Sequence, residues 1–232
     1  MRYCWCLRRT TTTRWTTFAT MTSFLHWCAM RRPSHQLAAQ EAGTQDQRPI
    51  IRKTRLVRGK SINLRDVVES DAEFVLQLRL DPRRNQYLSP VDAQVEVQRE
   101  WIRQYRESQG QAYFIICDAD FADLGTVRIY DAIGDSFSWG SWVLKEAAPP
   151  QAAIESAVLV YTLATRFWGF RAAHFRVHPA NTSVLAFHEK FGARRVTETP
   201  DEVQLCIGIA QIENSLSRFA RYAPKHIGVE AD

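Results

Sequence analysis

Residues 139–193 read WGSWVLKEAAPPQAAIESAVLVYTLATRFWGFRAAHFRVHPANTSVLAFHEKFGA, and this stretch decides the fold. Its aromatic and β-branched start predicts a strand over 137–144, which Pro149-Pro150 ends. A proline suits the first turn of a helix, because the amide that it lacks has no intrahelical partner there. Apolar residues then recur at three- and four-residue spacing from Ala152, so we expect one long helix that stops at Gly169. The expected inner stripe of this helix contains Ile154, Ala157, Val158, Tyr161, Leu163, Ala164 and Phe167.

A second strand and a short helix complete the stretch. Apolar residues alternate with polar ones over 173–178 and predict the strand, which Pro179 closes. Asn181 can cap the helix that follows, and Gly192 can end it. A strand–helix–strand unit of this size implies two parallel strands joined by a right-handed crossover.

The rest of the chain adds elements on both sides of this unit. Three consecutive strands joined by short turns, ending with the strand over 137–144, predict an antiparallel meander. The fold class is therefore α/β, with one central mixed sheet flanked by helices. Ser70 and Glu73 are expected to form a capping box at the first helix. The expected inner stripe of the second helix is Val97, Trp101, Ile102 and Tyr105. Further strands are expected over 61–67, 112–117, 124–130, 194–199 and 202–209, and further helices over 71–80, 91–108 and 212–222.

Three short motifs in the deciding stretch carry a family resemblance. GSWVL at 140–144 precedes the long helix, and HPANTSV at 178–184 and FHEKFGA at 187–193 follow it. With these motifs in this order, the chain resembles the GNAT superfamily of acetyl-CoA-dependent N-acetyltransferases. The branch that it resembles includes ribosomal-protein N-terminal acetyltransferases and bacterial amino-sugar acetyltransferases. The resemblance covers roughly residues 60–210 and implies the GNAT arrangement of a mixed sheet with helices on its faces.

The resemblance also implies where acetyl-CoA would bind. In the family, the strand before the long helix binds the pantetheine arm through its backbone. The loop and helix start that follow take the pyrophosphate, and the asparagine of the next helix also reaches the pantetheine arm. The residues implied as cofactor contacts are Trp142, Val143, Leu144, Gln151, Ala152, Ala153, Asn181 and Ser183.

The loop before the long helix departs from the family pattern. The family has a glycine-rich loop there, whereas this chain has Glu146-Ala147-Ala148-Pro149-Pro150-Gln151 without a glycine. A helix N-terminus still offers free amides and about half a positive charge, which favour a phosphate. Pro150 removes one donor, but alanines permit a close approach wherever φ stays negative. The alternatives are that the two prolines form only a rigid helix entry and that Asn181 serves only as a cap.

His188 is the candidate catalytic residue. It stands where many members of the family have a tyrosine that protonates the departing CoA thiolate, and an imidazole has an ordinary pKa of about 6.5. The alternative is a core residue, since His188 lies four residues after Val184 on the stripe with Phe191. Glu155 lies in the second turn of the long helix, where a carboxylate interacts well with the helix dipole.

Charge is concentrated at the N-terminus. Residues 1–50 carry seven arginines against Glu41 and Asp46, a net charge of +5, while the remaining 23 basic and 23 acidic residues cancel. The folded part, 51–232, therefore gives no indication of a nucleic-acid partner. We expect 1–50 to be a disordered basic leader. The alternatives are an organellar transit peptide, a translated upstream stretch with the true start at Met21 or Met30, and a nucleic-acid arm.

Two further partners are not expected. No run approaches the roughly 18 apolar residues of a membrane span, so no membrane partner is predicted. His174 and His178 share one strand face without a third ligand nearby, so no metal is predicted.

Cys117 and Cys206 lie in strand-like surroundings and are expected to be buried small hydrophobic residues.

Taken with the resemblance, these residues imply an acetyl-CoA-dependent N-acetyltransferase of the cytoplasm that acts on a small-molecule primary amine by direct attack. No nucleophile elbow, phosphate loop or dinucleotide fingerprint points to another class of enzyme. The neutral body favours an amino sugar or an uncharged metabolite amine over a basic protein tail. The alternative is a catalytically degenerate GNAT domain that binds an acyl-CoA or a protein partner. Whether the chain forms a homodimer stays open.

Overall fold

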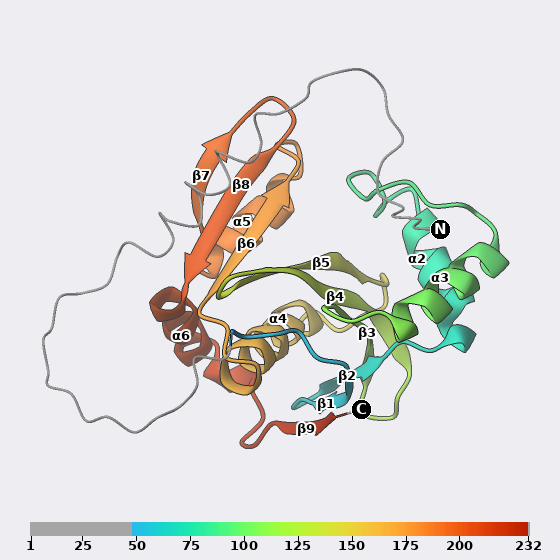
Figure 1. Cartoon of the computed structure of the whole chain (residues 1–232), viewed down its shortest axis with the longest axis horizontal. Coiled ribbons are helices and arrows are strands. Elements are labelled where there is room, and N and C mark those ends of the chain that lie inside the picture. The colour runs from blue at the N-terminus through green and yellow to red at the C-terminus, as the bar shows by residue number, and fades with distance from the viewer. Residues whose placement is uncertain (1–47, 232) are drawn as a thin grey trace, which may run out of the picture. The chain divides into compact units, whose positions relative to one another are not determined.

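A computed structural model describes residues 48–231, which build one mixed sheet of nine strands with helices against it (Figure 1). The strand order is β7-β8-β6-β5-β4-β3-β2-β1-β9, and β5 and β6 are the parallel pair in an otherwise antiparallel sheet. The fold class, the meander β3–β4–β5 and the crossover from β5 to β6 are therefore confirmed. The predicted leader lies outside the described residues except for its last three. The strands are β1 (Thr54–Arg58), β2 (Ile62–Asp66), β3 (Ala112–Asp118), β4 (Asp123–Ile133), β5 (Ser136–Leu144), β6 (Ala172–Val177), β7 (Arg194–Glu198), β8 (Val203–Gly208) and β9 (Gly228–Ala231).

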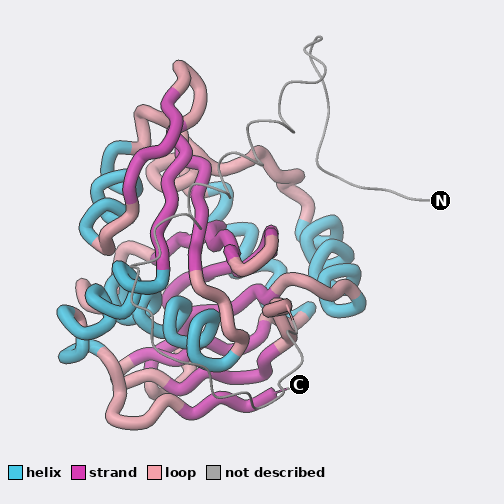
Figure 2. The backbone as a smooth tube through the Cα atoms, turned by 60° about the vertical axis from the view of Figure 1, so that its left-hand side comes forward, coloured by secondary structure: helices cyan, strands magenta, loops and turns pink. Residues whose placement is uncertain are grey.

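Helices cover both faces of this sheet, as Figure 2 shows. Successive residues of a strand point to opposite faces. Along β3, Phe114 and Ile116 join the larger core with α4, α5 and α6, while Tyr113 and Ile115 join a smaller core with α2 and α3. This burial on both faces explains the nearly continuous apolar sequence of β3. The helices are α2 (Ala72–Leu80), α3 (Val95–Glu107), α4 (Ala152–Thr162), α5 (Thr182–Lys190) and α6 (Ile209–Arg218), with short η1 (Glu69–Asp71), η2 (Leu163–Phe167) and η3 (Ala220–Tyr222).

The expected inner stripe of α3 was partly wrong. The helix begins at Val95 and not at 91, and its buried residues are Gln98, Ile102 and Tyr105. These residues are four and three positions apart, as one face of a helix requires. Val97 lies one residue before this face and is 46% exposed.

The long helix also differs from the expectation at its C-terminal end. The α-helical part stops at Thr162, and a five-residue π-helix, η2, continues the coil to Phe167. The wider turn changes the phase of the side chains, so Phe167 leaves the predicted stripe and is 46% exposed. Gly169 ends the coil as predicted, with a φ of +83° that favours glycine.

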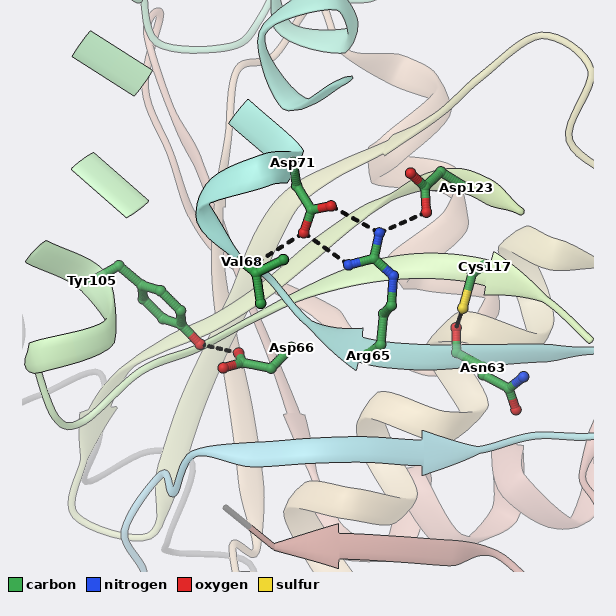
Figure 3. A network of polar contacts seen from close by, with 8 residues as sticks. All are labelled: Asn63, Arg65, Asp66, Val68, Asp71, Tyr105, Cys117 and Asp123. Atoms are coloured by element: carbon green, nitrogen blue, oxygen red, sulfur yellow. Dashed lines mark hydrogen bonds and ion pairs between the residues drawn. The ribbon is translucent and has the colours of Figure 1, made fainter. Parts of the chain in front are cut away.

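A charged network, drawn in Figure 3, replaces the capping box expected from Ser70 and Glu73. The Asp71 Oδ2 atom accepts the backbone N–H of Val68 at 2.8 Å, so Asp71 caps the turn that leads into α2. Arg65 donates to Asp71 Oδ2 at 2.8 Å and to Asp123 Oδ1 at 2.7 Å. Burial lowers the pKa of Arg65, but the hydrogen bonds to the two carboxylates outweigh it and raise the pKa.

The same strand, β2, is tied to α3 by a tyrosine. Tyr105 Oη donates to Asp66 Oδ1 at 2.6 Å (Figure 3). It also accepts the backbone N–H of Tyr113 at 2.8 Å. Cys117, on the neighbouring strand, is buried as predicted, and its thiol lies 3.7 Å from the carbonyl oxygen of Asn63. Burial raises the pKa of this thiol to about 11. Cys206 is buried as well.

We expect Arg65→Met to destabilise the protein. It leaves the buried Asp71 carboxylate without its cation, at a cost of roughly 2–3 kcal/mol, because Arg65 keeps some contact with solvent. For a chain of this size, the melting temperature should fall by about 5–10 °C in a thermal unfolding scan. Arg99→Met is the matched control, since Arg99 forms an ion pair with Glu96 in which the side chains are 42% and 77% exposed. Equal melting temperatures for the two variants would contradict the structural role of Arg65.

Candidate active site

The two parallel strands separate soon after they begin. β5 and β6 pair through Ser136–Ala172 and Phe137–Ala173, and the described residues form no later pair between them. Figure 1 shows the two strands diverging beyond this point. The second half of β5 therefore has backbone groups on its β6 side that the sheet does not use.

A bulge in β5 marks the point of separation. Ser141 has a φ of +45°, and the register with β4 shifts between the pairs Thr126–Val143 and Arg128–Gly140. The Thr126 hydroxyl donates to the carbonyl oxygen of Ser141 at 2.8 Å and holds this bend in place. A bulge bends its strand and increases its twist, so β5 turns away from β6 here.

The closed end of the divergence is fixed by two buried side chains and one exposed carboxylate. Ser136 Oγ lies 2.8 Å from His174 Nδ1, and His174 Nε2 lies 3.3 Å from Asp131 Oδ2. The hydrogen bond with His174 holds the pKa of Asp131 below its ordinary value. The order Ser–His–Asp is that of a hydrolase triad, but Ser136 is 1% exposed and cannot meet a substrate. These residues therefore connect the β4–β5 hairpin to β6.

The long helix α4 is anchored by Glu155. This carboxylate is 1% exposed and accepts the backbone N–H groups of Lys60 at 2.6 Å, Ser61 at 2.7 Å and Ile62 at 3.2 Å. The Ser61 hydroxyl donates to it as well. Glu155 thus fastens the first turns of α4 to the β1–β2 turn, a contact that the helix-dipole interpretation did not foresee.

The residues implied as pyrophosphate contacts lie at the start of α4. One of their backbone amides already donates a hydrogen bond within the protein. Ala152 is buried, and its N–H donates to the carbonyl oxygen of Pro149 at 2.9 Å. Gln151 is exposed and precedes the first turn, and Ala153 follows in the first turn. In a first turn the amides lack intrahelical acceptors, so Ala153 can still donate to a bound group.

The residues implied as pantetheine contacts lie beyond the bulge or at the start of α5. Val143 and Leu144 pair with β4 on one side, and Trp142 donates from Nε1 to Ser156 Oγ at 3.1 Å. Asn181 caps α5, as predicted, by accepting the Val184 N–H at 3.4 Å and the Ser183 hydroxyl at 3.2 Å. The cap role does not exclude the cofactor contact, which stays a prediction for all of these residues.

His188 lies in an aromatic cage between the diverging strands and α5. Its ring stacks on Phe175 of β6 at 3.8 Å between centroids and meets Trp139 of β5 edge to face at 5.2 Å. It is 4% exposed, and burial lowers its pKa to about 3. The imidazole is therefore neutral at neutral pH, which favours the packing alternative. The role as leaving-group acid stays a prediction.

One polar atom of this cage lacks a partner. His188 Nδ1 is buried and has no hydrogen-bond partner among the described residues, whereas the Tyr161 hydroxyl interacts with the side chain of Trp139. The Tyr161 ring contacts Trp139 at 5.8 Å between centroids, so the three residues are neighbours. Buried polar atoms are usually satisfied, so an unpartnered nitrogen here is consistent with a site that receives a ligand or water.

The α2–α3 loop contributes residues that the sequence did not indicate. Tyr87 stacks on His178, which follows β6, at 5.3 Å between ring centroids. Arg83 pairs with Glu146 of the β5–α4 loop at 2.7 Å, although both side chains are exposed, so the pair contributes little stability. A loop without periodicity carries no pattern from which such long-range contacts could be predicted.

The described residues contain neither a cluster that could hold a metal ion nor a helix that could span a membrane. No group of three or more His, Cys, Asp or Glu side chains there is placed to hold a metal ion. None of the helices in that part of the chain has the length and apolar character needed to cross a membrane.

Comparisons with known proteins agree with this geometry. Residues 61–194 match the family model described as an acetyltransferase (GNAT) domain. The structure of apo FdhC, described as a nucleotide-linked sugar GNAT, is 35% identical, covers 72% of this chain and 97% of its own, and has a TM-score of 0.65. A GCN5-related N-acetyltransferase from Brucella melitensis is 14% identical, with coverage of 78% and 91% and a TM-score of 0.64. The spermidine/spermine N-acetyltransferase SpeG from Vibrio cholerae is 13% identical, with coverage of 66% and 97% and a TM-score of 0.54. A search of curated proteins gave no significant match.

The burial of His188 predicts a specific loss of stability in acid. Its pKa in the folded protein, about 3, is below its ordinary value of 6.5, so between these values the unfolded chain binds a proton that the folded chain does not. Stability therefore falls as the pH drops below 6.5, and at about pH 5 this one residue should cost about 2 kcal/mol. His188→Phe should remove that part of the acid effect.

The measurement is the free energy of unfolding in urea at about pH 7.5 and about pH 5, compared between variants. His226→Phe is the control, since His226 is exposed and should leave the difference between the two pH values unchanged. If His188→Phe loses as much stability in acid as the unaltered protein, the imidazole is not held neutral by its cage.

Proposed function

Because the chain belongs to the GNAT acetyltransferase family, we propose that it is a cytoplasmic, acetyl-CoA-dependent N-acetyltransferase that acts on the amino group of a nucleotide-linked sugar. The observation that carries the proposal is the divergence of β5 and β6 after two paired residues. It leaves a backbone edge next to a helix start, which suits an extended ligand that ends in phosphates. The acceptor class is supported by the 35% identity to FdhC and by the amino-sugar expectation from the sequence.

The residues of the divergence fit an acyl-CoA. The backbone of Trp142, Val143 and Leu144 can donate to and accept from the amides of the pantetheine arm on the side that β6 leaves free. The first-turn amides beside Gln151 and Ala153 would face the pyrophosphate, with the positive end of the α4 dipole behind them. When bound, acetyl-CoA supplies an acetyl group activated as a thioester.

In the proposed reaction, the acceptor amine attacks the thioester carbonyl, so a C–N bond forms, a C–S bond breaks, and one proton passes from nitrogen to sulfur. The cage of Trp139 and Phe175 would keep water from the thioester, and free backbone amides of β5 would stabilise the developing oxyanion. His188 is neutral at neutral pH, so its part would be to hydrogen-bond the sulfur from a neutral N–H and to orient it.

A second function is favoured by the loop before α4. Pro150 has no N–H, the Ala152 N–H is taken by Pro149, and no glycine allows a closer approach to the backbone. A degenerate GNAT domain that binds an acyl-CoA or a protein partner without turnover has such a weakened loop. Binding and turnover therefore need separate measurements.

We expect acetyl-CoA to stabilise the full chain. A ligand at 100 times its dissociation constant adds about 2.7 kcal/mol, which corresponds to a rise in melting temperature of roughly 5–10 °C. Release of free CoA in the presence of a nucleotide-linked amino sugar then tests turnover, with spermidine and a free amino sugar as comparison acceptors. A thermal shift without CoA release from any acceptor would support a degenerate domain that binds acyl-CoA. No shift at millimolar acetyl-CoA would reject the acetyltransferase and favour the degenerate domain that binds a protein partner.

The role of His188 can be tested by its replacement. His188→Phe fills the cage but cannot donate to sulfur, so turnover should fall by about 10²-fold, as for loss of one donor to a developing charge. Acetyl-CoA affinity should change little. His188→Tyr adds one hydroxyl to the same ring and should recover most of the rate. Similar turnover for the Phe and Tyr variants would show that His188 serves only to pack the core.

A further inference from the structure

On the face of the sheet that α2 and α3 cover, one arginine is held rigidly without an acidic partner. Arg128 of β4 pairs with Tyr113 of β3, and both side chains point to this face. Its guanidinium lies 5.2 Å from the ring centroid of Trp101 and 5.2 Å from that of Tyr130, and it donates to Gln111 Oε1. Cation–π contacts of this kind orient a guanidinium but do not neutralise its charge.

A second arginine approaches the first from α2. Arg79, in the last turn of α2, donates from Nη2 to the carbonyl oxygen of Ser89 at 2.8 Å. Burial lowers the pKa of Arg128, and the positive charge of Arg79 adds to this; both charges also act on the Tyr113 hydroxyl. Like charges repel in a poorly solvated place, so this arrangement is costly without an anion.

Each arginine of this pair has a hydrogen-bond donor that no described residue accepts. The Nε atoms of Arg79 and Arg128 are both buried and have no partner. Within the described part of the chain, neither guanidinium has an ion pair, whereas Arg65 on the neighbouring strand is matched by two carboxylates. The fold thus places acids beside one half-buried arginine and not beside the two others.

The pair lies next to the point where β5 leaves β6. Arg128 is paired with Gly140, the residue before the bulge at Ser141. The Tyr130 hydroxyl lies 3.0 Å from the position that a Cβ atom on Gly140 would take, so any side chain at 140 would displace a ring that orients Arg128. The face is opposite to the one that α4 covers, where the acetyl donor would bind.

We infer that Arg79 and Arg128 form an anion site that binds the diphosphate of the acceptor. The inference deepens the proposed function and rests on it for the sugar that the diphosphate carries. A guanidinium presents a planar fork of donors that suits phosphate oxygens, and the forks of Arg79 and Arg128 would each take one of the two phosphates. The acceptor would then be held by its phosphates on the α2–α3 face, while its amine points toward the bulge of β5.

The test measures binding of uridine diphosphate and of inorganic pyrophosphate to the full chain by calorimetry, with and without saturating CoA. CoA fills the pyrophosphate subsite at α4, so binding that persists in its presence belongs to a separate site. We expect such binding, and a loss of at least about tenfold in affinity in Arg128→Gln and in Arg79→Gln, the effect of removing a charge-assisted hydrogen bond. Arg99→Gln, an exposed arginine of α3 with an acidic partner, should bind as the unaltered protein does.

Kinetics give a second readout that a merely structural role would not change. With a nucleotide-linked amino sugar, Arg79→Gln should raise KM for that acceptor by about tenfold or more and leave KM for acetyl-CoA unaltered. If Arg128→Gln does not fold, Arg79→Gln decides, because Arg79 lies in the last turn of α2 and belongs to neither apolar core. Diphosphate binding that is unaffected by either replacement, or that CoA abolishes, overturns the anion site.

The two proposals can fail separately. If the protein acetylates free amino sugars but binds no diphosphate beside CoA, the anion site is wrong and the acetyltransferase stands. If diphosphate binds through the two arginines but no amine yields free CoA, the anion site stands and the catalytic proposal is wrong.

Discussion

The short pairing of β5 with β6 is the constraint on which the candidate site depends. A parallel pair that continued would use the backbone of residues 142–144 for the sheet, and no extended ligand could bind there. Two local interactions prevent it. The contacts of Ser136, His174 and Asp131 hold the strands together at the closed end, and the bulge at Ser141 turns β5 away beyond it. The opening is therefore a property of the folded sheet and does not require a ligand.

The two faces beside this opening differ in chemistry. The α4 face is aromatic around His188, which is kept uncharged among Trp139 and Phe175. The α2–α3 face is also aromatic but carries the unmatched cations Arg79 and Arg128. Transfer of an acetyl group from a thioester is favoured where water is excluded. An anionic acceptor is bound best by guanidinium groups held in fixed positions. One sheet thus separates the proposed donor and acceptor sites and lets them meet at the bulge of a single strand.

The sequence predicted most of the fold because its strongest patterns are local. Prolines, glycines and alternating residues mark the elements over 137–193, and the structure confirms them. Two short strands, β1 and β9, were missed. β9 is an edge strand that forms only when the end of the chain pairs with β1, which itself has only five residues. Val97 was misplaced because the buried position of that turn is held by a polar residue, Gln98, which an apolar pattern does not mark. The environment of His188 depends on two strands and a helix meeting, which no spacing along the chain encodes.

The pairing of charges also depends on contacts between distant parts of the chain, which the local sequence does not indicate. A net charge of zero over residues 51–232 suggests a neutral acceptor, but net charge says nothing of where opposite charges fail to meet. Arg65 has two carboxylates within 2.8 Å, while Arg128 has a glutamine and two aromatic rings. Both residues are single arginines in strands, and their neighbours in the sequence do not indicate which of the two forms ion pairs. Only the fold decides which arginine receives an acid from the chain, and an arginine that receives none is left with its charge available to a substrate.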